Sequence, residues 1–553
     1  MRQSRRQFVG TALGAAVLAG ANLPAAAQSA PVRVSLSRFS RDRLASLRKG
    51  VAAMKALPPS DRRSWFWWAA THAYNDTLYA DALARDPKLA QVDAKRYWNQ
   101  CPHFGQCSAD FLIWHRAFLF YFERTLRNVA QDGDLALPYW DYGSAGGRGF
   151  PAAYLPQFLG AGIANPLFHP TRNYDFTNGE TMLSDPVALA PDTFSAPTFF
   201  SDIGVSGFGG DFRDAGNPRQ SLIETRPHGD IHMVVGGYIT GINSNGAMSD
   251  IPTAAFDPVF WAHHANIDRL WSVWASSPGK SWGPMPPDSW LDEAPFVFVD
   301  HDGNDTGQSR RFYMDRTNLS VRYDSDNPTK PELAMPPATV VVTASRIPAG
   351  HHAGRRSEPP APPEAAMLMD TMIQQIELAA DYAPINVSPN APVSREIGGP
   401  ARQAMAGGGM PSPPPPPPPP VGAEAPNAAA AGVNALKAPQ AKAGTRVVLE
   451  LSGISFDRAP SSGFAVYLAA PGNPNGAFVG LLDLFGATHP HVAGMSAMAA
   501  VQSFDVTAIV RAGRGPFTIR VAPYDLLVGK SGAPAPKRAD GVRIASVRFL
   551  ALG

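Results

Sequence analysis

Apolar residues recur at helical spacing through the first half of the chain and alternate with polar residues near its end. Residues 32–323 are rich in Trp and Phe, and apolar side chains surround most of a helix in the runs 111–123 and 257–268. From residue 445 onward, short runs of alternating apolar and polar residues are separated by turn residues. We therefore predict a mainly α domain followed by a C-terminal antiparallel β-sandwich.

A segment dominated by proline, alanine and glycine separates the two regions. It covers residues 327–444 and contains a proline run at 413–420, which favours a stiff polyproline II spacer. Within it, residues 363–380 fit an amphipathic helix. The predicted domains are thus a helical domain at 31–326, a linker at 327–444 and a sandwich at 445–553.

The first 27 residues have the features of an export signal. A twin arginine at positions 5 and 6 precedes a short apolar run at 10–23, and three alanines follow at 25–27. A membrane anchor is the less favoured alternative, because the run is short and rich in Ala and Gly. We predict a twin-arginine signal peptide, no membrane span and a location in the periplasm or outside the cell.

Charge and cysteine content exclude several functions. Lys and Arg number 48 against 46 Asp and Glu, and no concentrated basic run occurs, which argues against a nucleic-acid partner. The 2 cysteines exclude a disulfide scaffold and a four-thiolate zinc site. The 13 histidines are more informative, because several lie within apolar helices.

Six of these histidines form two groups of three along the chain. A lone buried histidine is usually a satisfied core residue, but the recurrence of the pattern favours metal ligands. Two members of the second group are four residues apart, which puts both rings on one helix face. All-imidazole groups suit copper better than magnesium or calcium; zinc also accepts three histidines, but two adjacent groups indicate a redox metal pair. The six residues are His72, His103, His115, His228, His232 and His264.

The runs 111–123 and 257–268 resemble the two copper signatures of tyrosinases and catechol oxidases, the type 3 copper polyphenol oxidases. The resemblance implies a four-helix bundle that holds two copper ions, and a phenolic substrate that is oxidised to an o-quinone with O2. It implies that His264, and not the adjacent His263, is the ligand; the two rings also point about 100° apart on one helix, which argues against a shared ion. The implied ligands are His72, His103 and His115 for copper A, and His228, His232 and His264 for copper B.

The resemblance extends beyond the histidines. Residues 288–323 look like the Asp-Trp-Leu segment and closing Tyr motif of plant polyphenol oxidases, and the predicted sandwich resembles their C-terminal domain more loosely. In that family the C-terminal domain can cover the copper site and keep the enzyme latent. An enzyme that is latent until its lid is removed is therefore one expectation.

Cys101 admits two interpretations. Its position two residues before His103 is the spacing at which some family members form a Cys–His thioether, whereas a disulfide with Cys107 would suit an exported protein. Seven residues separate His103 from Phe111, slightly more than in the usual pattern.

Three further residues resemble family positions around the substrate. Glu224 lies where the family has a glutamate that holds a water near the incoming phenol; the alternative is an exposed acid at a helix start. Its usual companion, an Asn after the first copper B histidine, is Gly229 here, so we expect diphenol oxidation to exceed monophenol hydroxylation. Ile251 aligns with the residue that gates the copper site, and simple core packing is the alternative.

Two other functions share the same predicted site. A haemocyanin-like O2-binding protein would hold the same two copper ions behind a blocked entrance, and an o-aminophenol oxidase would differ only in its substrate. The sequence does not select the physiological phenol or an oligomeric state.

Overall fold

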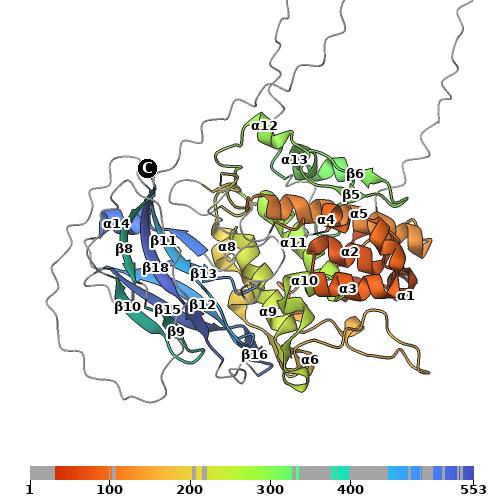
Figure 1. The fold of residues 1–553 in the computed structure, drawn as a ribbon, viewed down its shortest axis with the longest axis horizontal. Coiled ribbons are helices and arrows are strands. Elements are labelled where there is room, and N and C mark those ends of the chain that lie inside the picture. Colours follow the sequence, from red (N-terminus) through yellow and green to blue (C-terminus); the bar gives the residue numbers. More distant parts are fainter. Residues whose placement is uncertain are drawn as a thin grey trace, which may run out of the picture.

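A helical unit and a unit of strands lie side by side in the computed structural model (Figure 1). No helix within the described ranges has both the length and the apolar character needed to cross a membrane. The described residues are 31–98, 100–102, 107–201, 207–213, 221–326, 332–335, 375–381, 383–397, 446–470, 475–485, 487, 502–513, 517–531, 533, 535 and 540–552.

The helical unit is built around two long helices, α5 and α11. Both are buried on most of their surface, as their apolar sequences predict. The α-helices of this unit are α1 (Arg41–Ala56), α2 (Trp65–His72), α3 (Asp76–Arg85), α4 (Ala94–Tyr97), α5 (Asp110–Ala130), α6 (Tyr174–Thr177), α7 (Asp185–Leu189), α8 (Pro191–Ser195), α9 (Asp230–Gly236), α10 (Ile251–Ala254), α11 (Val259–Ala275), α12 (Asp288–Leu291) and α13 (Arg310–Met314).

Short strands and 3-10 turns connect these helices, and a π-helical turn, η5 (Glu224–Gly229), leads into α9. The strands are β1 (Val32–Arg33), β2 (Thr181–Leu183), β3 (Tyr238–Ile239), β4 (Ser244–Asn245), β5 (Phe298–Val299), β6 (Asp305–Thr306) and β7 (Arg322–Tyr323).

Local sequence explains where the central helices begin and how closely they pack. The Ser64 hydroxyl caps α2 by accepting from the Trp67 amide, and the Asp257 carboxylate accepts from the Val259 amide at the start of α11. On α1, a Cβ at Gly50 would lie 2.7 Å from Leu126 of α5, so glycine permits this close approach. These contacts hold the helices that carry the candidate ligands.

A buried ion network joins the two ends of the helical unit to its centre. Asp268 on α11 accepts from Arg33 of β1 at 3.1 Å, from Arg116 of α5 at 2.5 Å and from the Tyr323 hydroxyl at 2.5 Å. Arg33 also donates to Glu123 at 2.9 Å. Two cations, Arg33 and Arg116, therefore neutralise the buried Asp268 carboxylate.

The C-terminal unit, residues 375–552, contains two four-stranded sheets of antiparallel pairs. Their strand orders are β10-β15-β12-β13 and β14-β11-β18-β8. The strands of the unit, with its one described α-helix, are β8 (Gln375–Asp381), β9 (Ile385–Val387), β10 (Val393–Ile397), β11 (Arg446–Ser452), β12 (Ser462–Ala469), β13 (Ala477–Leu482), β14 (Gln502–Asp505), α14 (Thr507–Ala512), β15 (Phe517–Asp525), β16 (Leu527–Gly529), β17 (Val542–Ile544) and β18 (Ser546–Leu552).

The predicted linker boundary of 327–444 was wrong in part. β8, β9 and β10 lie inside that segment and belong to the C-terminal unit, and β8 occupies the end of the helix expected at 363–380. β8 pairs with β18 and β10 pairs with β15, more than a hundred residues later in the chain. Local periodicity does not reveal such distant strand partners. The proline run lies outside the described residues.

Candidate metal centre

Five of the six predicted ligands converge in the middle of the helical unit. They come from α2, α5, η5, α9 and α11, and each is at most 2 % exposed. His103, the sixth, lies outside the described residues, so its assignment stays a prediction. The five are His72, His115, His228, His232 and His264.

Four of these imidazoles are oriented by backbone carbonyl groups through Nδ1. Because a carbonyl oxygen only accepts hydrogen bonds, each Nδ1 must carry the proton, and each Nε2 then offers its lone pair to a metal ion. The pairs are His72 with Ile251 O at 2.8 Å, His115 with Phe111 O at 2.8 Å, His228 with Glu224 O at 2.9 Å and His232 with Met248 O at 2.7 Å.

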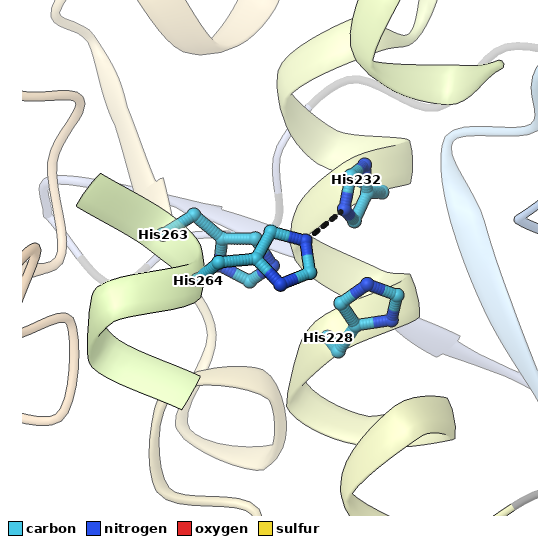
Figure 2. A group of neighbouring side chains, drawn as sticks. All are labelled: His228, His232, His263 and His264. Carbon is cyan, nitrogen blue, oxygen red and sulfur yellow. Dashed lines mark hydrogen bonds between the residues drawn. The ribbon is translucent and has the colours of Figure 1, made fainter. Parts of the chain in front are cut away.

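The copper B candidates form a compact group of rings. The Nε2 atoms of His232 and His264 lie 3.4 Å apart (Figure 2). Two imidazole nitrogens about 2 Å from one ion at a tetrahedral angle lie about 3.3 Å apart, so the observed spacing fits a shared ion. Burial also lowers the pKa of His264 well below its usual value, which keeps this ring neutral, as a metal ligand must be.

His263 approaches the same group, contrary to the expectation that its ring would point away. One potential ligand atom from each of His228, His232, His263 and His264 lies within 4.8 Å of the others. His263 stacks on the ring of His228 at 5.5 Å between centroids, and burial lowers its pKa to about 3. The angle of about 100° between neighbouring residues of a helix describes only the directions of their Cβ atoms. Rotation about the side-chain bonds turns the rings of His263 and His264 back toward the same side.

The second group contains His72, Cys101 and His115, again with ligand atoms within 4.8 Å of one another. The Cys101 sulfur lies 3.4 Å from His115 Nε2, and burial raises the pKa of this thiol. Both cysteines are free, and the Cys107 thiol donates to the Asp211 carbonyl at 3.1 Å, so the structure does not contain the alternative disulfide. The alternative thioether would join Cys101 to His103, which lies outside the described residues, so it stays a prediction.

The two groups are adjacent. The rings of His115 and His264 stack with centroids 4.2 Å apart and planes 10° apart, and the rings of His72 and His264 are 6.4 Å apart. Helices far apart in sequence therefore place two histidine groups, the second with the Cys101 sulfur beside it, next to each other in a buried, aromatic interior. This donor set suits copper, and the spacing suits two neighbouring ions.

The three substrate-site candidates all lie at this centre. Glu224 is only 1 % exposed, so its interpretation as an exposed helix-start acid was wrong; burial raises its pKa to about 8. Ile251 is buried, and its carbonyl accepts from His72, so it positions a ligand through its backbone. Gly229 has helical dihedral angles, φ −59° and ψ −42°.

The C-terminal unit reaches the copper B group through the turn after β13, residues 483–485, which we call the lid turn. The Phe485 ring stacks on His232 with centroids 3.9 Å apart and contacts His228 edge-on at 5.5 Å. A Cβ at Gly229 would lie 2.5 Å from the Asp483 carboxylate. Sequence reasoning missed both lid residues, because no local pattern connects them with the histidines.

Further contacts join the two units around the lid turn. The Tyr524 hydroxyl donates to the Asp230 carboxylate at 2.8 Å, and the Arg226 guanidinium lies 4.3 Å from the centre of the Tyr524 ring. β16 pairs with β2 of the helical unit, and the Ala459 amide donates to the Asn245 side chain at 2.9 Å. The copper B group is therefore covered by an extensive interface between the units.

Comparisons with known proteins agree with this geometry. Residues 62–277 match the common central domain of tyrosinase. The chain is 31% identical over 293 residues to tyrosinase HcTyr1 of Hahella sp. (strain CCB-MM4), covering 49% of this chain and 58% of that protein. It is 30% identical over 295 residues to the latent form of a chloroplastic polyphenol oxidase from Prunus armeniaca, covering 49% and 45%. The chain thus spans about half the length of the curated relatives it matches.

Among solved structures, latent apple tyrosinase has a similar fold. The TM-score is 0.52 at 20% sequence identity, over 95% of this chain and 98% of that chain. The domain match, the curated relatives and the two adjacent histidine groups agree in identifying residues 62–277 as a domain similar to the common central domain of tyrosinase.

Proposed function

We propose that this protein is a polyphenol oxidase that oxidises o-diphenols to o-quinones with O2. The observation that carries the proposal is the pair of adjacent, buried histidine groups, four of whose rings backbone carbonyls orient through Nδ1. Two copper ions bound there would supply the redox chemistry that couples a diphenol to O2. The ligands would be His72, His103 and His115 for one ion, and His228, His232 and His264 for the other.

The protein's own contribution to the reaction is positioning and proton handling. Glu224 lies four residues before His228, and its raised pKa keeps the carboxyl largely protonated at neutral pH. A carboxyl in this state donates a hydrogen bond to a phenolic oxygen or to a water, but it is a poor acceptor of the phenol proton. Gly229 adds no side-chain amide. Both features support a preference for diphenols, which lose their protons more readily, over monophenols.

The C-terminal unit is proposed to be a lid that keeps the enzyme latent. Phe485 lies against two copper B ligands, where a phenol ring would approach. Opening the lid would require separation of the interface between the units, or cleavage of the chain between residues 327 and 374. In this proposal the catalytic helices form a four-helix bundle and the two sheets of the C-terminal unit form a β-sandwich.

Export completes the proposal. The twin arginine and the apolar run at 1–27 support transport of the folded, copper-loaded protein to the periplasm or the cell exterior.

The test measures copper content and oxidase activity together. We expect two copper ions per chain, little oxidation of catechol by the intact protein, and strong oxidation after linker proteolysis or mild detergent. His264→Ala should lose about one copper ion and the activity, whereas His301→Ala, which alters a histidine outside both groups, should retain both. An activated protein with two copper ions that still fails to oxidise catechol would contradict the proposal, and equal rates with tyramine and its catechol would contradict the diphenol preference.

A further inference from the structure

A hairpin of nine consecutive exposed residues, 156–164, projects from the helical unit below α1, away from the strands (Figure 1). Its sequence is Pro-Gln-Phe-Leu-Gly-Ala-Gly-Ile-Ala, which contains no charge and one polar side chain. Phe158, Leu159 and Ile163 are 52%, 40% and 63% exposed. Three large apolar side chains on one protruding turn differ from the singly scattered apolar residues of an ordinary protein surface.

The hairpin is an ordered element. The Leu159 amide donates to the Ile163 carbonyl at 2.8 Å, and the Asn165 amide donates to the Gln157 carbonyl at 2.9 Å. At its base, the buried Asn165 side chain donates to the carbonyl oxygens of Ala153 and Pro156. The apolar side chains are thus held outward by a closed backbone frame.

Positive charge surrounds the base of the hairpin. Lys55 of α1 donates to the Pro166 carbonyl at 2.7 Å, and Arg48 of the same helix donates to the Ala153 carbonyl at 3.3 Å. No Asp or Glu occurs between residues 142 and 174, or between residues 43 and 60 of the facing helix segment. The apolar tip therefore has a cationic rim, formed by Arg48 and Lys55, at its base.

We propose that the hairpin inserts into the interface of an anionic lipid surface, with the cations of α1 against the headgroups. A narrow convex tip inserts among lipid chains without a shaped complement, whereas a stable protein partner needs about 800 Å² of matched surface on each side. The cationic rim complements anionic headgroups, and each basic residue near the surface adds to binding. This surface is remote from the lid turn, and the inference does not depend on the proposed oxidase activity.

Co-sedimentation of the full chain with lipid vesicles tests the inference. We expect binding to phosphatidylglycerol vesicles, weaker binding to phosphatidylcholine vesicles, and a loss of affinity of about tenfold for each of Phe158→Ser and Ile163→Ser, from the apolar area withdrawn from lipid. Lys55→Glu should weaken binding to the anionic vesicles only. Ile242→Ser is the matched control, because Ile242 is 56% exposed outside the hairpin, and it should leave binding unchanged.

All variants keep the same N-terminal segment, so its own affinity for lipid cancels in the comparison. The circular dichroism spectrum and the thermal unfolding midpoint of each variant check folding without reference to the oxidase activity. The inference is overturned if the hairpin variants sediment with vesicles as the unsubstituted chain does, or if Ile242→Ser loses binding equally. A dimer in sedimentation velocity that Phe158→Ser dissociates would overturn it as well, by assigning the tip to a second copy of this chain.

Discussion

Gly229 is the position where a single methyl group should separate the two units. It follows His228, a candidate copper B ligand, and an added Cβ would lie 2.5 Å from an Asp483 oxygen, about 1 Å inside an ordinary contact distance. Asp483 has little freedom to withdraw, since its carboxylate accepts from the Phe485 amide at 2.9 Å and its backbone pairs with the Gln502 side chain. Overpacking of this kind costs about 1–3 kcal/mol.

This steric cost applies only to the closed state, in which Asp483 of the lid turn lies against Gly229. Gly229 has helical dihedral angles, so alanine favours the local helix by about 1 kcal/mol when the lid is away. A bias of 1–3 kcal/mol raises the ratio of open to closed protein by about 5- to 150-fold. Gly229→Ala should therefore raise the basal rate of catechol oxidation by a factor in that range, while the fully activated rate stays near that of the unsubstituted protein.

The assay compares basal and detergent-activated rates of the copper-loaded protein, with protease sensitivity of the lid turn as a second readout. Gly241→Ala is the matched control, because a Cβ there meets nothing within 4 Å. The double variant Gly229→Ala/Asp483→Ala should recover part of the latency, since it removes the clash. If Gly229→Ala were as latent and as protease-resistant as the unsubstituted chain, the assigned contact would be refuted.

Three further predictions address stability, covalent chemistry and the interface. Burial alone would raise the pKa of Asp257, but the Arg172 guanidinium outweighs the effect of burial and holds that pKa below its usual value. The ion pair therefore stabilises the fold above about pH 4, and this stability is lost as the pH falls. Asp257→Asn should lower the free energy of unfolding by about 3–5 kcal/mol at pH 7 in denaturant titrations, with a smaller difference below pH 4. As the control, Asp185→Asn removes an exposed ion pair and should lower the free energy of unfolding by less than about 1 kcal/mol. Mass spectrometry of reduced, copper-loaded protein should find one alkylatable cysteine if Cys101 forms the thioether, and two would refute it. Tyr524→Phe removes a hydrogen bond to a buried carboxylate, worth about 1.5–3 kcal/mol, and should raise the basal oxidase rate about tenfold or more; an unchanged rate would show that this bond does not hold the lid.

Local sequence was sufficient for the helices and for the burial of four candidate ligands. His228 and His232 are one helical turn apart, and His115 and His264 lie in long apolar runs, so short-range periodicity already placed their rings on buried faces.

Local reasoning failed where a residue's role depends on distant contacts. The buried state of Glu224 and the approach of His263 result from packing between helices, and the strand β8 owes its conformation to β18. Phe485 lies more than 250 residues from the ring it covers.

The amino-acid sequence by itself determined that this chain contains buried helices with histidines in two sets, because helical periodicity and capping act over four residues or fewer. Only the tertiary structure decided that the two sets are adjacent, which nitrogen each ring presents and what covers them. Those properties arise from desolvation and from contacts between segments that are far apart in the chain, and no local pattern encodes them.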